Sequence, residues 1–221
     1  MLYITGDTHG DYWDLFERTK DLGLTSDDTV IICGDFGFIF IDDYFLTKLT
    51  LLPWNIAFVD GNHENFDKLE SYPVEEWNGG TVHRIAKNIV HLMRGNVFNI
   101  EEKTFFCMGG AYSIDKGMRK EGVSWWSRES PSNEEYRTAS ASLEKHNMTV
   151  DYILTHNIPE RGFYELGYSP DMHDKELVGF LQWVFENVNF KEWFAGHFHI
   201  DKVVCDRVRI LYGDVVPVSE D

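Results

Sequence analysis

One pattern constrains this chain of 221 residues most: an apolar run that ends in a tight, polar turn. The clearest instance is the run 55–60, a predicted buried strand, which leads into Gly61-Asn62-His63-Glu64. Gly and Asn at the carboxyl end of a strand favour a tight turn. That rim is where open α/β sheets bind their ligands. Similar turns follow four other predicted strands, at 2–5, 29–33, 150–155 and 193–195.

The first third of the chain has the element order of a parallel sheet. Predicted strands alternate with predicted helices in the order strand 2–5, helix 11–22, strand 29–33, helix 42–52, strand 55–60 and helix 64–72. The run 29–33 is rich in β-branched residues and apolar on both faces, as a central parallel strand requires. This alternation is the βαβ rhythm of an α/β fold.

The remainder of the chain predicts a second group of strands. Short apolar runs at 89–93, 97–100 and 104–108 predict antiparallel pairing and the start of a second sheet. Residues 110–132 are rich in Gly, Ser and Trp and predict a long loop, which is often functional in a compact domain. Later elements are predicted as helix 134–146, strand 150–155, helix 175–187, strand 193–195 and a hairpin of 202–205 with 208–212. At this length we expect a single domain, 1–221.

The formal net charge of -17 bears on possible partners. A chain this acidic repels phosphate backbones, so we expect no broad nucleic-acid binding and no attraction to an anionic membrane surface. Bound divalent cations would reverse the sign of the potential locally. The sequence does not predict an oligomeric state.

The cysteines and the N-terminus predict a cytoplasmic protein. Cys33, Cys107 and Cys205 lie in or beside apolar runs, and no two form a Cys-x-x-Cys pair. Because the number of cysteines is odd and their spacing matches no motif, we expect reduced, buried thiols and not a disulfide framework. Residues 1–7 lack the basic and apolar regions of a signal peptide. No apolar run approaches the ~18 residues of a transmembrane helix.

The polar residues after the strands form one candidate set. Its members are Asp7, His9, Asp35, Asn62, His63, His156, His197 and His199. Asp-x-His and His-x-His place two side chains on one face of an extended segment. Nitrogen and oxygen donors without a thiolate suit Mn²⁺, Fe or Zn²⁺ better than Ca²⁺ or a structural zinc. The set exceeds the needs of one ion and predicts two metals about 3.5–4 Å apart, with a carboxylate as the natural bridge.

Five motifs, in this order, resemble those of the calcineurin-like metallophosphoesterases. They are Gly6-Asp7-Thr8-His9-Gly10, Gly34-Asp35, Gly61-Asn62-His63-Glu64, Thr155-His156 and Gly196-His197-Phe198-His199. The resemblance extends from residue 6 to residue 199, nearly the whole chain. It implies an α/β fold in which two mixed β-sheets, flanked by helices, form a four-layer α-β-β-α sandwich.

The resemblance also implies a role for each motif residue. Asp7, His9 and His199 would bind the first metal, and Asn62, His156 and His197 the second, with Asp35 as the bridge. A hydroxide between the metals would attack phosphorus in line. His63 would protonate or hydrogen-bond the leaving oxygen. The catalytic residues would thus be His63, Asp35 and Asn62, and the cofactors two divalent ions, Mn²⁺ first, with Fe or Zn²⁺ as alternatives.

The second motif departs from that of the family's protein phosphatases, Gly-Asp-x-x-Asp-Arg-Gly. Phe38 stands where the second Asp would orient the catalytic histidine, and Ile39 where an Arg would bind phosphate. We therefore expect a phosphodiesterase acting on a small or nucleotide-like substrate, because a diester carries one less negative charge. A phosphomonoesterase or a Ser/Thr protein phosphatase-like enzyme is the alternative. A non-catalytic protein-binding scaffold is another, but it would have lost ligands, and none of the motif ligands is missing.

Several other residues carry weaker predictions. Residues of the long loop either line the substrate pocket or face solvent, and the sequence favours neither: Ser113, Asp115, Lys116 and Arg119. For Trp125-Trp126 we expect packing rather than base stacking, since stacking platforms usually lie in basic grooves. The histidines outside the motifs are expected to have structural or surface roles: His83, His91, His146 and His173.

Overall fold

The computed structural model describes residues 1–38 and 40–218. Ile39, for which the sequence predicts the loss of a phosphate-binding arginine, lies outside the described residues. The helices are α1 (Tyr12–Thr19), α2 (Asp43–Thr50), α3 (Phe66–Leu69), α4 (Asn133–Lys145), α5 (Glu160–Glu165) and α6 (Lys175–Asn187). The strands are β1 (Leu2–Thr5), β2 (Thr29–Cys33), β3 (Asn55–Val59), β4 (Val74–Trp77), β5 (Gly80–Ala86), β6 (Ile89–Leu92), β7 (Val97–Ile100), β8 (Lys103–Met108), β9 (Tyr152–Thr155), β10 (Glu192–Ala195), β11 (Lys202–Val204), β12 (Val208–Ile210) and β13 (Val215–Pro217).

The strands of the described residues form two mixed sheets. The first has the order β13-β1-β2-β3-β6-β5-β4, and the second β11-β12-β10-β9-β8-β7. The strands β1, β2, β3 and β6 are mutually parallel, as are β8, β9, β10 and β12, while the outer strands pair antiparallel. The carboxyl ends of each parallel set therefore meet at one edge of its sheet.

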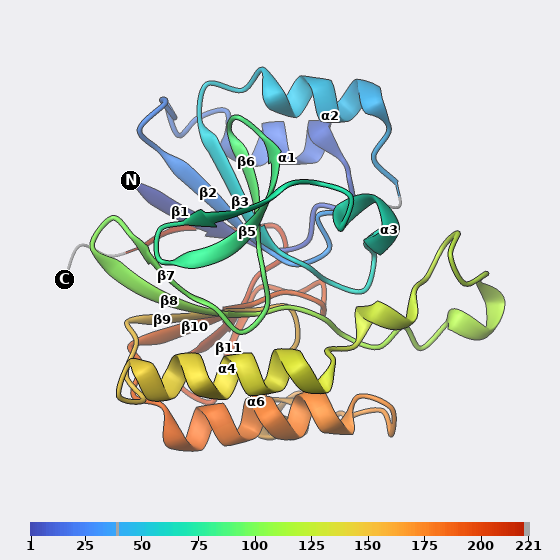
Figure 1. Ribbon diagram of the computed structural model, residues 1–221, viewed down its shortest axis with the longest axis vertical. Coiled ribbons are helices and arrows are strands. Elements are labelled where there is room, and N and C mark those ends of the chain that lie inside the picture. Colours follow the sequence, from blue (N-terminus) through green and yellow to red (C-terminus); the bar gives the residue numbers. More distant parts are fainter. Residues whose placement is uncertain (39, 219–221) are drawn as a thin grey trace.

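Alternate residues of β2 face opposite sides of the first sheet and pack in two different layers of the core. Val30 and Ile32 pack in one apolar cluster with Leu15 of α1, whereas Ile31 and Cys33 belong to the cluster between the sheets. All five residues of this strand are buried, because a helix covers one face and the second sheet covers the other. The helices α1 and α2 thus form the outer layer over the first sheet (Figure 1).

The second sheet likewise has one face packed against the first sheet and the other face packed against helices. Phe105 and Tyr152 face the first sheet, while Phe106 and Ile153 pack in the cluster that contains Leu143 of α4 and residues of α6. Figure 1 shows α4 and α6 side by side beneath this sheet. The four-layer α-β-β-α sandwich of two mixed sheets flanked by helices is confirmed. No helix in the described part of the chain is long and apolar enough to cross a membrane.

Some elements differ from their predictions. The strand predicted at 89–93 does not start the second sheet: β6 pairs parallel with β3 in the first sheet, and the second sheet starts with the predicted β7–β8 hairpin. The helix predicted at 64–72 is shorter, because α3 begins after Asn65, whose side chain caps it by accepting a hydrogen bond from the Lys68 N–H. The helix predicted at 11–22 ends at Thr19. The elements β4, β5, β13 and α5 were not predicted.

The β4–β5 hairpin carried a signal in the sequence. Its turn is Asn78-Gly79, and both residues have positive φ, 51° and 88°. Asn-Gly is the preferred pair for a type I′ hairpin turn, whose twist matches that of the strands. The strand β4 lies at the edge of its sheet and is mostly exposed, so its Val-Glu-Glu-Trp sequence lacks the apolar run that marks a buried strand.

Candidate metal centre

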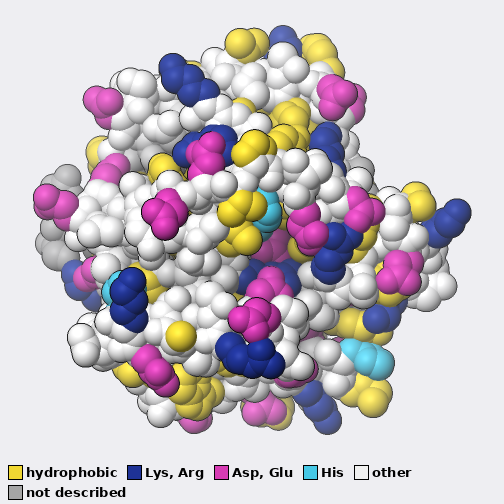
Figure 2. Space-filling view, viewed as in Figure 1, with side chains coloured by type: hydrophobic (Ala, Val, Ile, Leu, Met, Phe, Trp, Pro, Cys, Tyr) yellow, Lys and Arg dark blue, Asp and Glu magenta, His cyan; other side chains and the backbone are white. Residues whose placement is uncertain are grey.

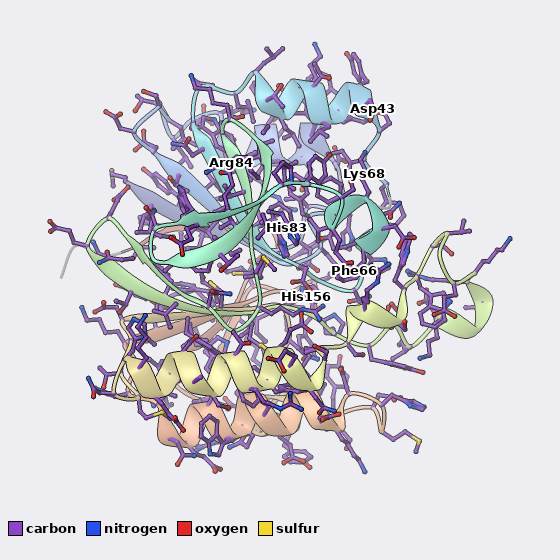
Figure 3. The ribbon with its side chains drawn as sticks, in the orientation of Figure 1. Asp43, Phe66, Lys68, His83, Arg84 and His156 are labelled. Atoms are coloured by element: carbon purple, nitrogen blue, oxygen red, sulfur yellow. The ribbon has the colours of Figure 1, made fainter. Side chains whose placement is uncertain are left out.

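The predicted ligands follow the carboxyl ends of parallel strands in both sheets. Asp7, Asp35 and Asn62 come after β1, β2 and β3 of the first sheet, while His156 and His197 come after β9 and β10 of the second. His156 lies in the middle of the molecule, between the helical layers (Figure 3). The two strand ends face each other, so residues separated by as many as 190 positions become neighbours.

The first group of donor atoms surrounds the Asp7 carboxylate. His199 Nε2 lies 3.1 Å from Asp7 Oδ2 and 3.0 Å from His9 Nε2. The distance between His9 Nε2 and Asp7 Oδ2 is 3.8 Å. Each of the three offers a ligand atom within 4.8 Å of the others, a spacing that could hold a metal ion.

The second group forms around His156. Asn62 Oδ1 lies 3.1 Å from His156 Nε2, and Asp35 Oδ1 lies 3.5 Å from the same nitrogen. Asp7, Asp35 and His156 form a second set of ligand atoms within 4.8 Å of one another. The ring centroids of His156 and His197 are 4.8 Å apart.

The Asp35 carboxylate lies between the two groups. Its Oδ1 is near His156 in the second group, and its Oδ2 is 3.8 Å from His9 Nδ1 in the first. Asp35 is 1% exposed and Asp7 is fully buried. Two buried carboxylates among imidazole and amide donors form a site that fits divalent cations, because charges so deeply buried are normally paired or bound to metals.

The electrostatics of the histidines fit this arrangement. Burial and the neighbouring His156 lower the pKa of His197 to about 3, so its imidazole is neutral and free to act as a ligand. The hydrogen bond to Asp7 raises the pKa of His199. A proton held there must leave before the nitrogen can bind a metal, which makes metal binding pH-dependent.

The backbone at the site is strained. His9, Asp35, His197 and His199 have φ values of 48°, 43°, 71° and 50°, the left-handed region that non-glycine residues rarely adopt. Such conformations cost about 1–3 kcal/mol each and concentrate at functional sites, where the surrounding structure holds them. Four of the seven predicted metal ligands are in this conformation.

Two motif glycines leave room for the ligands. A Cβ on Gly34, whose φ is +90°, would lie 2.1 Å from His156 Nδ1. A Cβ on Gly196 would lie 2.1 Å from Asp7 Oδ1. Each glycine precedes a predicted ligand and packs against a ligand from the opposite sheet, so the glycines allow the two strand ends to approach.

The long loop 110–132 reaches the site through Ser113. The Asn62 side-chain amide donates to Ser113 Oγ at 3.1 Å, and this hydroxyl donates to Glu129 at 2.8 Å. Because Asn62 gives its N–H to Ser113, its oxygen is directed toward His156. Ser113 thus lines the pocket, which is one of the two roles that the sequence left open for it. It also orients a predicted ligand, which no sequence motif indicated.

His63 stands beside the donor set and has polar contacts with Asp35 and Arg119. Its backbone N–H donates to Asp35 Oδ1 at 2.7 Å, and Arg119 Nη1 lies 2.9 Å from His63 Nδ1. Burial lowers the pKa of His63; Arg119 adds to the effect, while Asp35 opposes it. The exposed Phe40 ring lies 5.7 Å from the His63 ring between centroids, a neighbour that no sequence motif indicated.

Phe38 does not face His63. Its ring is 2% exposed and packs in the outer core of the first sheet, against Phe36, Phe58 and Tyr72. Its backbone N–H donates to the buried Glu64 carboxyl at 2.9 Å, and burial raises the pKa of Glu64 well above its usual value. The motif position of Phe38 predicts that it stands where an Asp would orient the catalytic histidine. That prediction is wrong, because the Phe38 ring packs in the core.

We expect Phe38→Asp to destabilise the protein instead of restoring a catalytic pair. The change removes a core aromatic, typically about 3–5 kcal/mol, and brings a carboxylate into the same apolar cluster beside Glu64. Urea unfolding should show a loss of at least about 3 kcal/mol. Phe40→Asp is the matched control, because an exposed aromatic two residues later should change stability by only about 0.5 kcal/mol. Equal midpoints for the two variants would contradict this placement of Phe38.

A buried ion pair anchors the strand end before Asn62. Arg94 Nε donates to Asp60 Oδ2 at 2.9 Å, and His91 Nε2 lies 3.1 Å from Asp60 Oδ1. Burial opposes ionisation of Asp60, but Arg94 and His91 lower its pKa. His83 stacks on His91 at an interplanar angle of 7°. Both histidines are buried and structural, as predicted.

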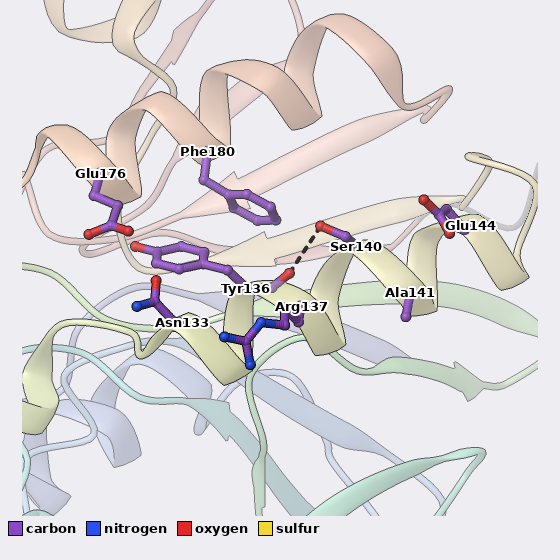
Figure 4. A pocket seen from close by; sticks show the side chains of 8 residues that line it. All are labelled: Asn133, Tyr136, Arg137, Ser140, Ala141, Glu144, Glu176 and Phe180. Carbon is purple, nitrogen blue, oxygen red and sulfur yellow. Dashed lines mark hydrogen bonds between the residues drawn. The ribbon is translucent and has the colours of Figure 1, made fainter.

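The pocket over the donor set has a volume of about 290 Å³. Its lining residues are Asp35, Asn62, His63, Tyr112, Ser113, Ile114, Asp115, Arg119, His197 and His199. Two larger hollows lie elsewhere. One has a volume of about 650 Å³, and its lining includes Arg94 and Arg128. The other, of about 540 Å³, is a groove between α4 and α6 beside Tyr136 and Phe180 (Figure 4). Neither contains a predicted ligand.

Comparison with known proteins agrees with this geometry. The family model described as calcineurin-like phosphoesterase matches residues 2–201. The chain belongs to this family. Membership in this family supports the prediction that the protein is a metal-dependent phosphoesterase. The matched residues include all five predicted motifs. A search of curated proteins found no match.

A solved structure shares the fold. It is a Staphylococcus aureus protein proposed to be a 5'-nucleotidase, crystallised with alpha-ketoglutarate. The TM-score is 0.51 at 13% sequence identity, and the alignment covers 99% of this chain but 51% of the other. The chain thus spans about half the length of that protein, and at this identity the likeness concerns the fold alone.

Proposed function

We propose that this member of the calcineurin-like phosphoesterases hydrolyses small phosphate esters with two divalent metal ions, and that it prefers diesters to monoesters. The proposal rests on two neighbouring groups of donor atoms. Asp7 belongs to both groups, and the Asp35 carboxylate has one oxygen near His156 and the other near His9. A single structural ion would not need two buried carboxylates and five nitrogen or amide donors.

Each residue has a distinct role in this proposal. Asp7, His9 and His199 would hold one ion, and Asn62, His156 and His197 the other, with Asp35 contributing to both. When bound, divalent ions, for which Mn²⁺ is our first choice, would supply an activated water and positive charge for the phosphoryl oxygens. His63 lies next to Asn62 and outside both donor groups, where it can hydrogen-bond the leaving oxygen. Ser113 keeps the Asn62 oxygen aimed at the site.

The preference for diesters rests on what surrounds His63. Among the described residues, the polar group that meets its ring is a guanidinium, and the family's orienting carboxylate has no counterpart there. The pocket is small and the exposed Phe40 ring stands beside His63, which suits the aromatic or sugar group of a small nucleotide-like diester.

A phosphomonoesterase is the second candidate, and one observation favours it. The guanidinium of Arg119 supplies positive charge at the pocket, which a dianionic monoester needs more than a monoanionic diester does. The solved structure that shares the fold, proposed to be a 5'-nucleotidase, would belong to this class of activity.

A substrate panel tests the proposal directly. With Mn²⁺, wild-type protein should hydrolyse bis(p-nitrophenyl) phosphate with a higher kcat/KM than p-nitrophenyl phosphate, and the difference should exceed about tenfold, or about 1.4 kcal/mol. The same assay on cyclic and linear nucleotides would narrow the substrate class. A higher kcat/KM for the monoester would select the second candidate, and hydrolysis of neither ester would contradict both.

The surface and the cysteines support the remaining parts of the proposal. On the face in Figure 2, acidic and basic side chains are interspersed, and the whole chain carries a net charge of -17. We therefore propose small substrates and no broad nucleic-acid partner. Cys33, Cys107 and Cys205 are free and buried, which suits the reducing cytoplasm.

A further inference from the structure

Arg119 comes from the long loop and is held in place on two sides. Its Nε donates to Asp115 Oδ2 at 2.8 Å, and its Nη2 lies 2.7 Å from the same oxygen. Its Nη1 also donates to the Ser124 carbonyl at 3.3 Å. The side chain is 18% exposed, so its charged group is largely fixed before any substrate arrives.

The fixed guanidinium points into the pocket over the donor set. Its Nη1 and Nη2 lie 2.9 and 3.4 Å from the two ring nitrogens of His63. Among the described residues that line this pocket, Arg119 is the one lysine or arginine. The other lining side chains include the carboxylates of Asp35 and Asp115, so the guanidinium is the natural place for an anionic group to bind.

The loop also has contacts that do not involve Arg119. Lys116 lies over the Tyr112 ring, 4.0 Å from its centroid, and 4.9 Å from that of Trp125. Trp126 is buried and donates from Nε1 to Asp67 at 2.8 Å, in keeping with the packing role predicted for it. These contacts help to hold the loop, and the Arg119 guanidinium is part of the pocket lining, where a ligand can reach it.

We propose that Arg119 is the phosphoryl-binding residue of this enzyme. It would supply from the loop the cation that the second motif lacks, donating two N–H groups to non-bridging oxygens of the substrate. The assignment rests on the proposed phosphoesterase function. In the structure the Nη1 donor is directed at His63 Nδ1, and a charged phosphoryl oxygen is a stronger acceptor for it than an imidazole nitrogen. Asp115 acts as a positioning residue, because its carboxylate holds Nε and Nη2 of the guanidinium.

Inorganic phosphate is the probe that isolates this role from turnover. Its affinity for the Mn²⁺-loaded protein is measured by calorimetry and as a competitive inhibition constant. Arg119→Ala should weaken phosphate binding by about tenfold to hundredfold, the usual range for losing hydrogen bonds between charged groups. Arg119→Lys keeps the charge but loses the fork, so it should recover part of that loss. Lys120→Gln is the matched control, since it removes one positive charge from the next, exposed position and should change the affinity less than twofold.

Turnover adds a second readout. In Arg119→Ala the kcat/KM should fall further for p-nitrophenyl phosphate than for bis(p-nitrophenyl) phosphate, because the monoester carries the extra charge. Metal analysis must give the wild-type ion content in each variant. If Arg119→Ala fails to retain metal, the comparison is made with Arg119→Lys, which preserves the side-chain stem and charge and should still bind phosphate more weakly than wild type.

The outcomes separate this assignment from the proposed function. Unchanged phosphate affinity in the metal-loaded variants would overturn the role of Arg119, even if wild type is an active esterase. Unchanged phosphate affinity together with altered leaving-group dependence would show that Arg119 acts only through His63, which also overturns it. Arg119-dependent phosphate binding by a wild-type protein that hydrolyses no ester would support the site and contradict the proposed function.

Discussion

Removing divalent ions with EDTA is expected to abolish ester hydrolysis, and Mn²⁺ should restore it. The ions are proposed to supply several kcal/mol of charge stabilisation, which at about 1.4 kcal/mol per tenfold corresponds to a loss of roughly 10³-fold or more. The measurement is the rate with bis(p-nitrophenyl) phosphate before chelation, after chelation and after readdition of metal. Full activity in metal-free protein, verified by elemental analysis, would contradict the metal-dependent mechanism.

The sharper form of this prediction concerns Asp35→Asn. Asp35 lies between the two donor groups, with one oxygen near His156 and the other near His9. An asparagine has nearly the same shape and can still accept the His63 backbone N–H, so the change removes mainly the negative charge. Because outer-shell changes alone cost about 10- to 100-fold in metal affinity, losing a bridging carboxylate should cost more. We expect the variant to retain fewer than two ions.

A control for this variant comes from the other end of a site strand. Asp151 precedes β9 and accepts hydrogen bonds from Thr104, whereas His156 follows the same strand. Asp151→Asn should leave metal content and turnover near the wild-type level. If Asp35→Asn retains two ions as tightly as Asp151→Asn, Asp35 is not the bridge.

The sequence predicted the strand ends well for a physical reason. A buried parallel strand must be apolar on both faces, so the first polar residue after it marks the rim of the sheet. The ends of β1, β2, β3, β9 and β10 all carry this signal, and the structure brings their polar residues together. Each of these signals lies within a few consecutive residues. The meeting of the two sheets, in contrast, depends on residues that are far apart in the sequence.

What the sequence did not predict depends on contacts between distant segments. Nothing local distinguishes Ser113 from a solvated serine, yet it accepts a hydrogen bond from Asn62, 51 positions away. Arg119 likewise meets His63 only because the long loop folds back over the pocket. The edge strand β4 has no buried face to enforce a pattern. Phe38 was assigned a direction from its motif position, but the apolar cluster around Phe58 determines where its ring lies.

The final prediction concerns His63 and the leaving group. Its ring stands beside the donor set, and its backbone is fixed by Asp35, so it is placed to assist departure of the ester oxygen. An alkoxide needs a proton or a hydrogen bond in the transition state, whereas a nitrophenolate is stable enough to leave nearly unaided. General acid assistance is typically worth about 10²–10⁴-fold. His63→Ala should therefore lower kcat/KM for an alkyl phosphodiester by about that factor, and for a nitrophenyl diester far less.

The environment of His63 makes this test informative. Burial and Arg119 lower the pKa of His63, which favours the neutral imidazole; a neutral ring can still donate a hydrogen bond to the leaving oxygen from its protonated nitrogen. The variant must contain the same number of metal ions as wild type, because Asn62 is the adjacent residue. His146→Ala is a matched control, since this histidine caps α4 and contacts the Ser142 carbonyl, outside the pocket lining. Equal losses for both esters would assign His63 to substrate binding or metal positioning, because a residue that assists departure must discriminate between a poor and a good leaving group.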